Sequence, residues 1–226
     1  MDQAIEGPSR EALSRGARQT MMLLLAVALI VVLQLPLAGW VFPGESLTAQ
    51  VEREGVYWAL TAVLVMFITL VERRPLSSVN LRRPTWKSLV FGVACGLVMV
   101  AVIAVLYIWV LPRLGSTKSV EQLSTVLALP LWFRIEIVVR AAIFEELLYR
   151  GFMIERLTEL FRSRWVAAGI SVVVFTSEHL GYWGWGHLLI AGFGGCVLTA
   201  LYLWRRDLAS NMVAHFVVDG IGFLIG

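Results

Sequence analysis

Hydrophobic residues fill long runs of this chain, and polar residues gather in the short intervals between them. A run of about 20 apolar residues can cross the hydrocarbon core of a bilayer as a helix. Seven runs approach or exceed this length, over residues 21–42, 56–71, 89–111, 132–155, 165–185, 187–204 and 208–226. The pattern therefore predicts an all-α fold, a polytopic transmembrane helix bundle of about seven spans.

The composition excludes an ordinary soluble protein. Hydrophobic residues make up 58% of the chain and charged residues 15%, and the mean hydropathy is +0.77. Soluble domains carry about 45–50% apolar and about 25% charged residues. We therefore expect a polar N-terminal segment at residues 1–20 and a single transmembrane domain over residues 21–226. The run at 21–42 is too long for a signal peptide and shows no clear cleavage site, so we expect it to be retained.

Basic residues alternate between rich and poor connections. They are concentrated in the N-terminal segment, in residues 72–88, in residues 156–164 and at 205–206, and they are sparse in the connections between these. Loops rich in Lys and Arg stay in the cytoplasm. The alternation predicts an odd number of spans with a cytoplasmic N-terminus, and it explains the net charge of +3 without a nucleic-acid partner.

The fourth hydrophobic run contains charges that are costly in a membrane and that mark function by default. They are Arg134, Glu136, Arg140, Glu145, Glu146 and Arg150. The spacing of four predicts ion pairs from Glu146 to Arg150 and from Glu136 to Arg140. Glu145 has no basic residue three or four positions later, which indicates a carboxylate left free for chemistry. We expect Arg134 and Arg140 to snorkel toward the outer interface. The alternative is an ion-paired seam between helices.

Two of the three histidines lie inside predicted spans. His179 ends the sequence Phe-Thr-Ser-Glu-His, and His215 shares a helical face with Asn211 and Asp219 because each is four residues from the next. A single histidine is usually a satisfied core residue, but this group of polar residues is harder to explain by packing. His187 lies at a span boundary, and we interpret it as interfacial and non-catalytic.

Helical rise places Glu145, His179 and His215 where they can meet near mid-membrane, biased toward the cytoplasm. This depth requires the fourth helix to continue beyond Arg150. A carboxylate and two imidazoles can activate water, with Glu145 as general base, His179 beside the water and His215 stabilising an oxyanion. The same three residues, Glu145, His179 and His215, could instead bind a divalent metal such as zinc. The sequence does not choose between these mechanisms, and it contains no HExxH or GxSxG motif.

Three motifs occur in order along the chain: Glu145-Glu146-x-x-x-Arg150, Phe175-x-x-x-His179 and His215-x-x-x-Asp219. Together they resemble the motifs of the CPBP family of intramembrane proteases. This family is also called Abi, and it includes the type II CAAX prenyl endopeptidases. The resemblance covers residues 125–222. It implies a helical membrane protein of a prokaryotic cell membrane, with a site open to the cytoplasm, that hydrolyses a peptide bond in a membrane-associated protein or peptide, prenylated or not.

The resemblance implies a role for each motif residue. Glu145 resembles the water-activating glutamate, Glu146 and Arg150 its supporting residues, and His179 a second water contact. His215 and Asp219 occupy the positions of oxyanion binding or metal ligation, and the family has been discussed both as metalloproteases and as glutamate proteases. Asp219 departs from the Asn of prenyl endopeptidases. An ionised Asp cannot donate a hydrogen bond, so it must be protonated, orient His215 or contact a metal.

Two other functions remain open at this point. One is a non-proteolytic membrane immunity or scaffold protein, and the other is a small transporter.

Gly92 and Gly96 form a GxxxG motif that predicts close helix packing, with dimerisation as the alternative. Cys95 and Cys196 lie in apolar runs, and we expect both to be small buried residues without a disulfide or redox role.

Overall fold

The computed structural model describes residues 10–225, which form helices and connecting segments without a strand. Residues 1–9 of the predicted cytoplasmic segment, and Gly226, lie outside the described residues. The α-helices are α1 (Arg10–Leu33), α2 (Leu37–Val41), α3 (Leu47–Met66), α4 (Trp86–Val105), α5 (Lys118–Leu127), α6 (Leu131–Glu145), α7 (Ile154–Phe161), α8 (Arg164–Glu178), α9 (Leu180–Trp183), α10 (His187–Arg205) and α11 (Leu208–Gly220). Shorter 3₁₀ segments are η2 (Leu76–Val79) and η4 (Pro112–Leu114), and π-helical segments are η1 (Phe67–Val71), η3 (Leu106–Val110), η5 (Glu146–Met153) and η6 (Ile221–Ile225).

Within residues 10–225, four helical stretches are long and apolar enough to cross a membrane: Leu47–Val71, Trp86–Leu114, His187–Arg205 and Leu208–Ile225. They correspond to the second, third, sixth and seventh predicted spans. The second begins at Leu47 rather than near residue 56. Ser46 caps it by accepting a hydrogen bond from the Ala49 amide at 3.2 Å, so the helix includes charged residues that hydropathy alone leaves out.

The other three predicted spans differ from simple apolar helices. The run at 21–42 is broken because α1 ends at Leu33, shortly before Pro36, which has no amide hydrogen and disfavours helix at the preceding residue. The run at 132–155 is one continuous helix through α6, η5 and α7, but it carries too many charged residues to be recognised as a membrane span by composition. The run at 165–185 is divided between α8, which has 15 residues, and the single turn of α9.

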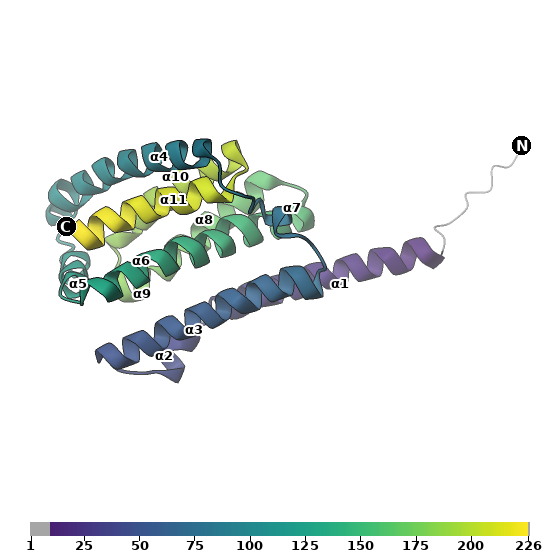
Figure 1. The fold of residues 1–226 in the computed structure, drawn as a ribbon, viewed down its shortest axis with the longest axis horizontal. Helices are drawn as coiled ribbons and strands as arrows, with labels where there is room; N and C mark the ends of the chain where they lie inside the picture. The colour runs from purple at the N-terminus through teal and green to yellow at the C-terminus, as the bar shows by residue number, and fades with distance from the viewer. Residues whose placement is uncertain (1–9, 226) are drawn as a thin grey trace, which may run out of the picture.

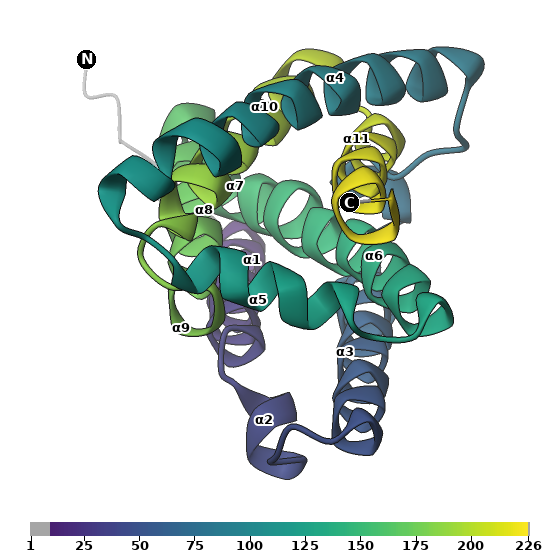
Figure 2. The ribbon, with the colours of Figure 1, turned by 90° about the vertical axis from the view of Figure 1, so that its left-hand side faces the viewer.

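The helices are arranged around α11 and α6. Figure 1 shows α4, α11 and α6 layered, with α1 and α3 along the opposite side. In the end view of Figure 2, α5 crosses in front of the bundle, near α9. The largest cluster of buried apolar residues joins η5 and α7 with α1, α3, α8 and α10. The charged helix α6–η5–α7 therefore lies within the protein, and more peripheral helices surround it.

Small residues on α4 and α10 have different surroundings. A Cβ atom on Gly92 would lie 2.6 Å from Val213 Cβ, and one on Gly96 would lie 2.7 Å from Val217 Cβ. The GxxxG motif thus lets α4 approach α11 within the same chain, which confirms the predicted close packing. Cys95 and Cys196 are both free, but Cys196 is exposed, so its predicted burial is wrong.

One end of the bundle is held by ion pairs to α7, which we call the α7 ion network. It consists of Glu72, Arg74, Glu155, Arg156, Glu159 and Arg206. Arg156 binds both oxygens of Glu72 at 2.7 and 2.5 Å, Arg206 binds Glu155, and Arg74 binds Glu159. Three of the predicted basic-rich segments therefore meet at the same end, which Figure 1 shows around α7.

Candidate active site

The continuous helix α6–η5 presents the two glutamates of the first motif. It begins directly after Pro130 and contains neither Gly nor Pro before Gly151, so nothing interrupts its hydrogen bonding. The winding changes from α to π directly after Glu145. Single π-helical turns within α-helices are frequent at functional sites. The helix continues to Phe161, as the predicted depth of Glu145 required.

Glu146 is fully buried, and both of its oxygens are occupied. Arg150 Nη1 and His215 Nδ1 each donate to Oε1 at 2.8 Å, and Asn211 Nδ2 donates to Oε2 at 3.1 Å. The side chains of Glu146 and Arg150 are both 0% exposed, which confirms their predicted ion pair. The Arg150 guanidinium also lies 4.2 Å from the centroid of the Phe175 ring. Glu146 therefore holds α11 against η5.

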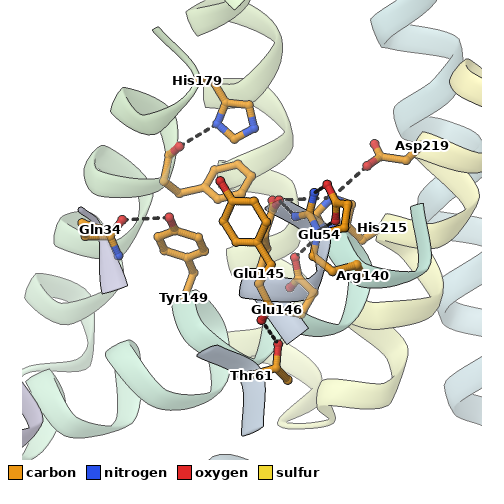
Figure 3. A network of polar contacts seen from close by, with 12 residues as sticks. Gln34, Glu54, Thr61, Arg140, Glu145, Glu146, Tyr149, His179, His215 and Asp219 are labelled. Carbon is orange, nitrogen blue, oxygen red and sulfur yellow. Dashed lines mark hydrogen bonds and ion pairs between the residues drawn. The ribbon is translucent and has the colours of Figure 1, made fainter. Parts of the chain in front are cut away.

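His215 is surrounded by three carboxylates (Figure 3). Its Nδ1 is bound to Glu146, and its Nε2 lies 3.3 Å from Asp219 Oδ2 and 4.0 Å from Glu145 Oε2. Asn211, His215 and Asp219 share one face of α11, as their spacing predicted. Of the meanings considered for Asp219, the contact with His215 Nε2 corresponds to orientation of the imidazole.

Glu145 is not the free carboxylate that its helical neighbours suggested. Arg140 Nη1 donates to Glu145 Oε1 at 3.3 Å, while Arg140 Nε and Nη2 bind Glu54 at 2.6 and 3.1 Å. The predicted pair from Glu136 to Arg140 is not formed among the described residues, since Glu136 accepts a hydrogen bond from Trp58 Nε1 at 2.7 Å. Arg140 is buried, so its predicted snorkelling is also wrong. The cause is α3, whose Glu54 is a nearer partner than any residue on α6.

Arg134 likewise has a partner within the protein. Its Nη1 donates to the Phe223 carbonyl at 2.9 Å and so ties the start of α6 to η6 near the C-terminus.

Glu145 remains the more accessible of the two motif glutamates, because its side chain is 19% exposed and that of Glu146 is fully buried. Its Oε2 lies on the side of His215, at a distance too long for a direct hydrogen bond.

His179 lies apart from this group, as Figure 3 shows. It follows the last residue of the short helix α8, so it is at the end of the bundle opposite the α7 ion network rather than biased toward the basic-rich end. Its Nδ1 is 2.8 Å from the Phe175 carbonyl oxygen. Because a carbonyl only accepts, Nδ1 carries the hydrogen, and Nε2 of the neutral ring is an acceptor.

His187 is a residue whose surroundings the sequence did not predict. It is buried within the protein, and its ring stacks with His179, at a centroid distance of 5.6 Å, and with Trp183, at 4.5 Å. Its Nδ1 lies 3.3 Å from the Tyr107 hydroxyl. The contact with Tyr107 brings α10 to η3 across 80 positions of sequence, so no local pattern could have predicted it.

The predicted metal ligands do not converge. No group of three or more His, Cys, Asp or Glu side chains with the geometry of a metal site occurs among residues 10–225. Both nitrogens of His215 already face carboxylates, and His179 contacts Phe175 and His187 instead of Glu145. Glu145, His179 and His215 as placed here do not fit a zinc ion, and we derive no step through a metal.

Comparison with known proteins gave one result. The family model described as "Type II CAAX prenyl endopeptidase Rce1-like" matches residues 127–221. The matched segment runs from the end of α5 to the start of η6, so it contains all three sequence motifs but neither α3 nor α4. Searches among curated proteins and among solved structures gave no match.

Proposed function

We propose that the chain is an intramembrane endopeptidase of the CPBP family of CAAX-type proteases, because residues 127–221 match the Rce1-like family model. Its substrate is a membrane-associated protein or peptide, prenylated or not. We place it in a prokaryotic cell membrane, with seven spans and a cytoplasmic N-terminus. The four apolar helices among residues 10–225 support the membrane location, and the gathering of basic segments at α7 supports a cytoplasmic side at that end.

The difference between Glu145 and Glu146 supports the assignment of the general base. Both oxygens of Glu146 accept hydrogen bonds from buried donors and its side chain is fully buried, so it is engaged within the protein rather than accessible to water. Glu145 is held through Oε1 only, and its Oε2 faces Nε2 of His215 across 4.0 Å. A general base must reach its proton directly or through one water. Glu145 is the glutamate that meets this condition.

The proposed reaction is hydrolysis by activated water. Glu145 Oε2 takes a proton from water, and the resulting hydroxide oxygen bonds to the scissile carbonyl carbon. The oxyanion that forms is stabilised by His215 Nε2–H, with Asp219 orienting the ring. The proton on Glu145 then passes to the leaving nitrogen as the carbon–nitrogen bond breaks. Positioned proton transfer of this kind contributes about 10²- to 10⁴-fold to a rate.

His179 has the acceptor nitrogen needed to hold the same water. Its ring contacts Phe175 and His187 rather than Glu145, and catalytic hydrogen bonds commonly tighten only when substrate is bound. We therefore assign His179 to the substrate-bound state, where Nε2 would contact the water or its proton. Glu146 and Arg150 are supporting residues that fix the position of His215.

The direct test is substrate trapping in native membranes with Glu145→Gln. We expect full-length substrate to accumulate with this variant, and cleavage to fall by about 10²-fold or more. Glu121→Gln is the matched control, because Glu121 is exposed on α5 and should leave cleavage unchanged. Wild-type cleavage by a folded Glu145→Gln variant would overturn the assignment. A phenotype that persists without any cleavage would instead identify a scaffold or immunity protein.

A further inference from the structure

We propose that Glu54 and Arg140 form a positioning pair for Glu145, in which Glu54 fixes Arg140 and Arg140 fixes the carboxylate. The inference rests on the proposed role of Glu145 as general base and assigns part of the site to α3. Glu54 lies outside the segment that matches the family model, and Arg140 lies inside it. Neither residue belongs to the three sequence motifs.

A chain of contacts connects Glu54 on α3, through Arg140, to Glu145. Glu54 accepts from Arg140 Nε at 2.6 Å and from Nη2 at 3.1 Å, which holds the guanidinium in a two-point geometry. The remaining terminal nitrogen, Nη1, points to Glu145 Oε1 at 3.3 Å. The Arg140 Cζ atom lies over the Tyr57 ring, 4.6 Å from its centroid, so α3 also supports the guanidinium by a cation–π contact. All three nitrogens of Arg140 are thereby directed.

Orientation of Glu145 follows from these contacts. The side chain of Glu145 is partly exposed and would otherwise rotate, because its carboxyl torsion is broad. The contact at Oε1 leaves Oε2 facing His215. Arg140 thus determines which oxygen is available to take a proton.

Charge balance explains why two partners are needed. A guanidinium paired with Glu145 alone would favour a closed ion pair and withdraw the carboxylate from water. Glu54 offsets the charge of Arg140 and holds it with the shorter bonds, so the contact with Glu145 is the longest of the three. The pair therefore orients Glu145 and leaves it able to react.

The competing explanation is that the pair only docks α3 onto α6. The same two helices share another polar tether, the hydrogen bond from Trp58 to Glu136 at 2.7 Å, which does not touch Glu145. Trp58→Phe removes that tether and keeps an aromatic ring. It is the matched control for helix docking.

The decisive variant is the double substitution Glu54→Leu with Arg140→Met. Replacing a buried ion pair by apolar residues of similar volume is often neutral for stability, so α3 should stay docked while Glu145 loses its contact. We expect kcat to fall about 10- to 100-fold with little change in KM, as for a misplaced catalytic group. We expect Arg140→Lys to recover part of this loss and Trp58→Phe to keep wild-type kcat. Wild-type kcat in the double variant, or an equal loss in Trp58→Phe, would overturn the proposal.

A second readout does not depend on proteolysis. A membrane-soluble carbodiimide reacts with accessible carboxylic acids to give a stable acylurea, which peptide mass spectrometry locates. We expect the double variant to be labelled at Glu145 several-fold more than wild type, since the carboxylate loses its guanidinium partner. Equal labelling would overturn the positioning pair even if the protein is no protease. Increased labelling in a protein that cleaves nothing would instead refute the proposed function alone.

Discussion

Two ion networks occupy different levels of this bundle, and they are built from the same residue types. In the α7 ion network, three carboxylates face three arginines, and each arginine has its own carboxylate. At the centre, the carboxylates of Glu54, Glu145, Glu146 and Asp219 face two arginines, Arg140 and Arg150, together with His215. We call this second set the central network. Its carboxylates outnumber its arginines by two.

The difference distinguishes ion pairs that hold helices together from the carboxylates to which we assign a role in the proposed reaction. A balanced set of arginines and carboxylates neutralises itself and fastens helices together. A set with excess carboxylates is not neutralised by its arginines. Here His215 lies among three of the carboxylates, and one oxygen of Glu145 has no strong donor. Under the proposed function, the excess of carboxylates distinguishes the central network from the α7 ion network, whereas buried charge is common to both.

The largest effect should follow from Glu146→Leu, because it leaves two buried hydrogen-bond donors without their acceptor. Arg150 and His215 both donate to Glu146 and are almost inaccessible to solvent. We expect a loss of at least about 3 to 5 kcal/mol in the free energy of unfolding. Thermal unfolding in detergent measures it. Glu145→Gln is the control and should stay close to wild type, since Arg140 keeps Glu54; equal stability of the two variants would contradict the division of roles.

A smaller loss should follow from Arg156→Leu in the α7 ion network. The Glu72 side chain, 4% exposed, would lose both of its hydrogen bonds to the guanidinium. We expect a cost of about 3 kcal/mol, with unchanged cleavage per folded molecule. Unfolding curves and an activity assay normalised to folded protein distinguish the two outcomes. Loss of catalysis in the folded fraction would show that this network is not merely structural.

Gly96→Ala should disturb the packing of α11 against α4. The added Cβ would lie 2.7 Å from Val217 Cβ and 2.8 Å from the Ala214 carbonyl oxygen, so α4 and α11 must separate. We expect about 1 to 3 kcal/mol of destabilisation, as for overpacking, together with reduced activity because α11 carries His215. Gly169→Ala, where a Cβ meets nothing within 4 Å, is the matched control. A Gly96→Ala variant as stable and active as Gly169→Ala would refute the close contact.

The smallest effect should come from Arg74→Ala at the edge of the α7 ion network. The side chains of Arg74 and Glu159 are 36% and 29% exposed, so water can replace much of their interaction. We expect less than about 1 kcal/mol of change in unfolding free energy. A cost as large as that of Arg156→Leu would mean that the network acts as one cooperative unit.

The sequence predicted the parts of the fold that rest on local patterns. Long apolar runs predicted α10 and α11, the GxxxG motif predicted the approach of Gly92 and Gly96 to a neighbouring helix, and the spacing of four predicted the pair of Glu146 and Arg150. The motif order also predicted the family. Each of these depends on residues close together in the chain or on composition.

The central network was only partly predictable, because its partners come from distant positions. Glu54 and Arg140 are 86 residues apart, and hydropathy placed Glu54 outside the second span. The capping signal at Ser46 would have placed the helix start correctly and included Glu54 in the second predicted span. No comparable signal indicates that Arg140 would reach Glu145 or that His187 would stack on His179.

The π-helical segment η5 has a consequence for helical phase. A wider turn uses more residues per revolution, so every residue after Met153 is rotated about the axis relative to an uninterrupted α-helix. This rotation lets one continuous helix direct Glu146 toward α11 and then direct Arg156 toward Glu72. A one-residue deletion within η5 would return the helix to α-helical phase and turn Arg156 away while leaving Glu145 unmoved. The length of η5 therefore sets the relative orientation of the two networks, although they share no residue.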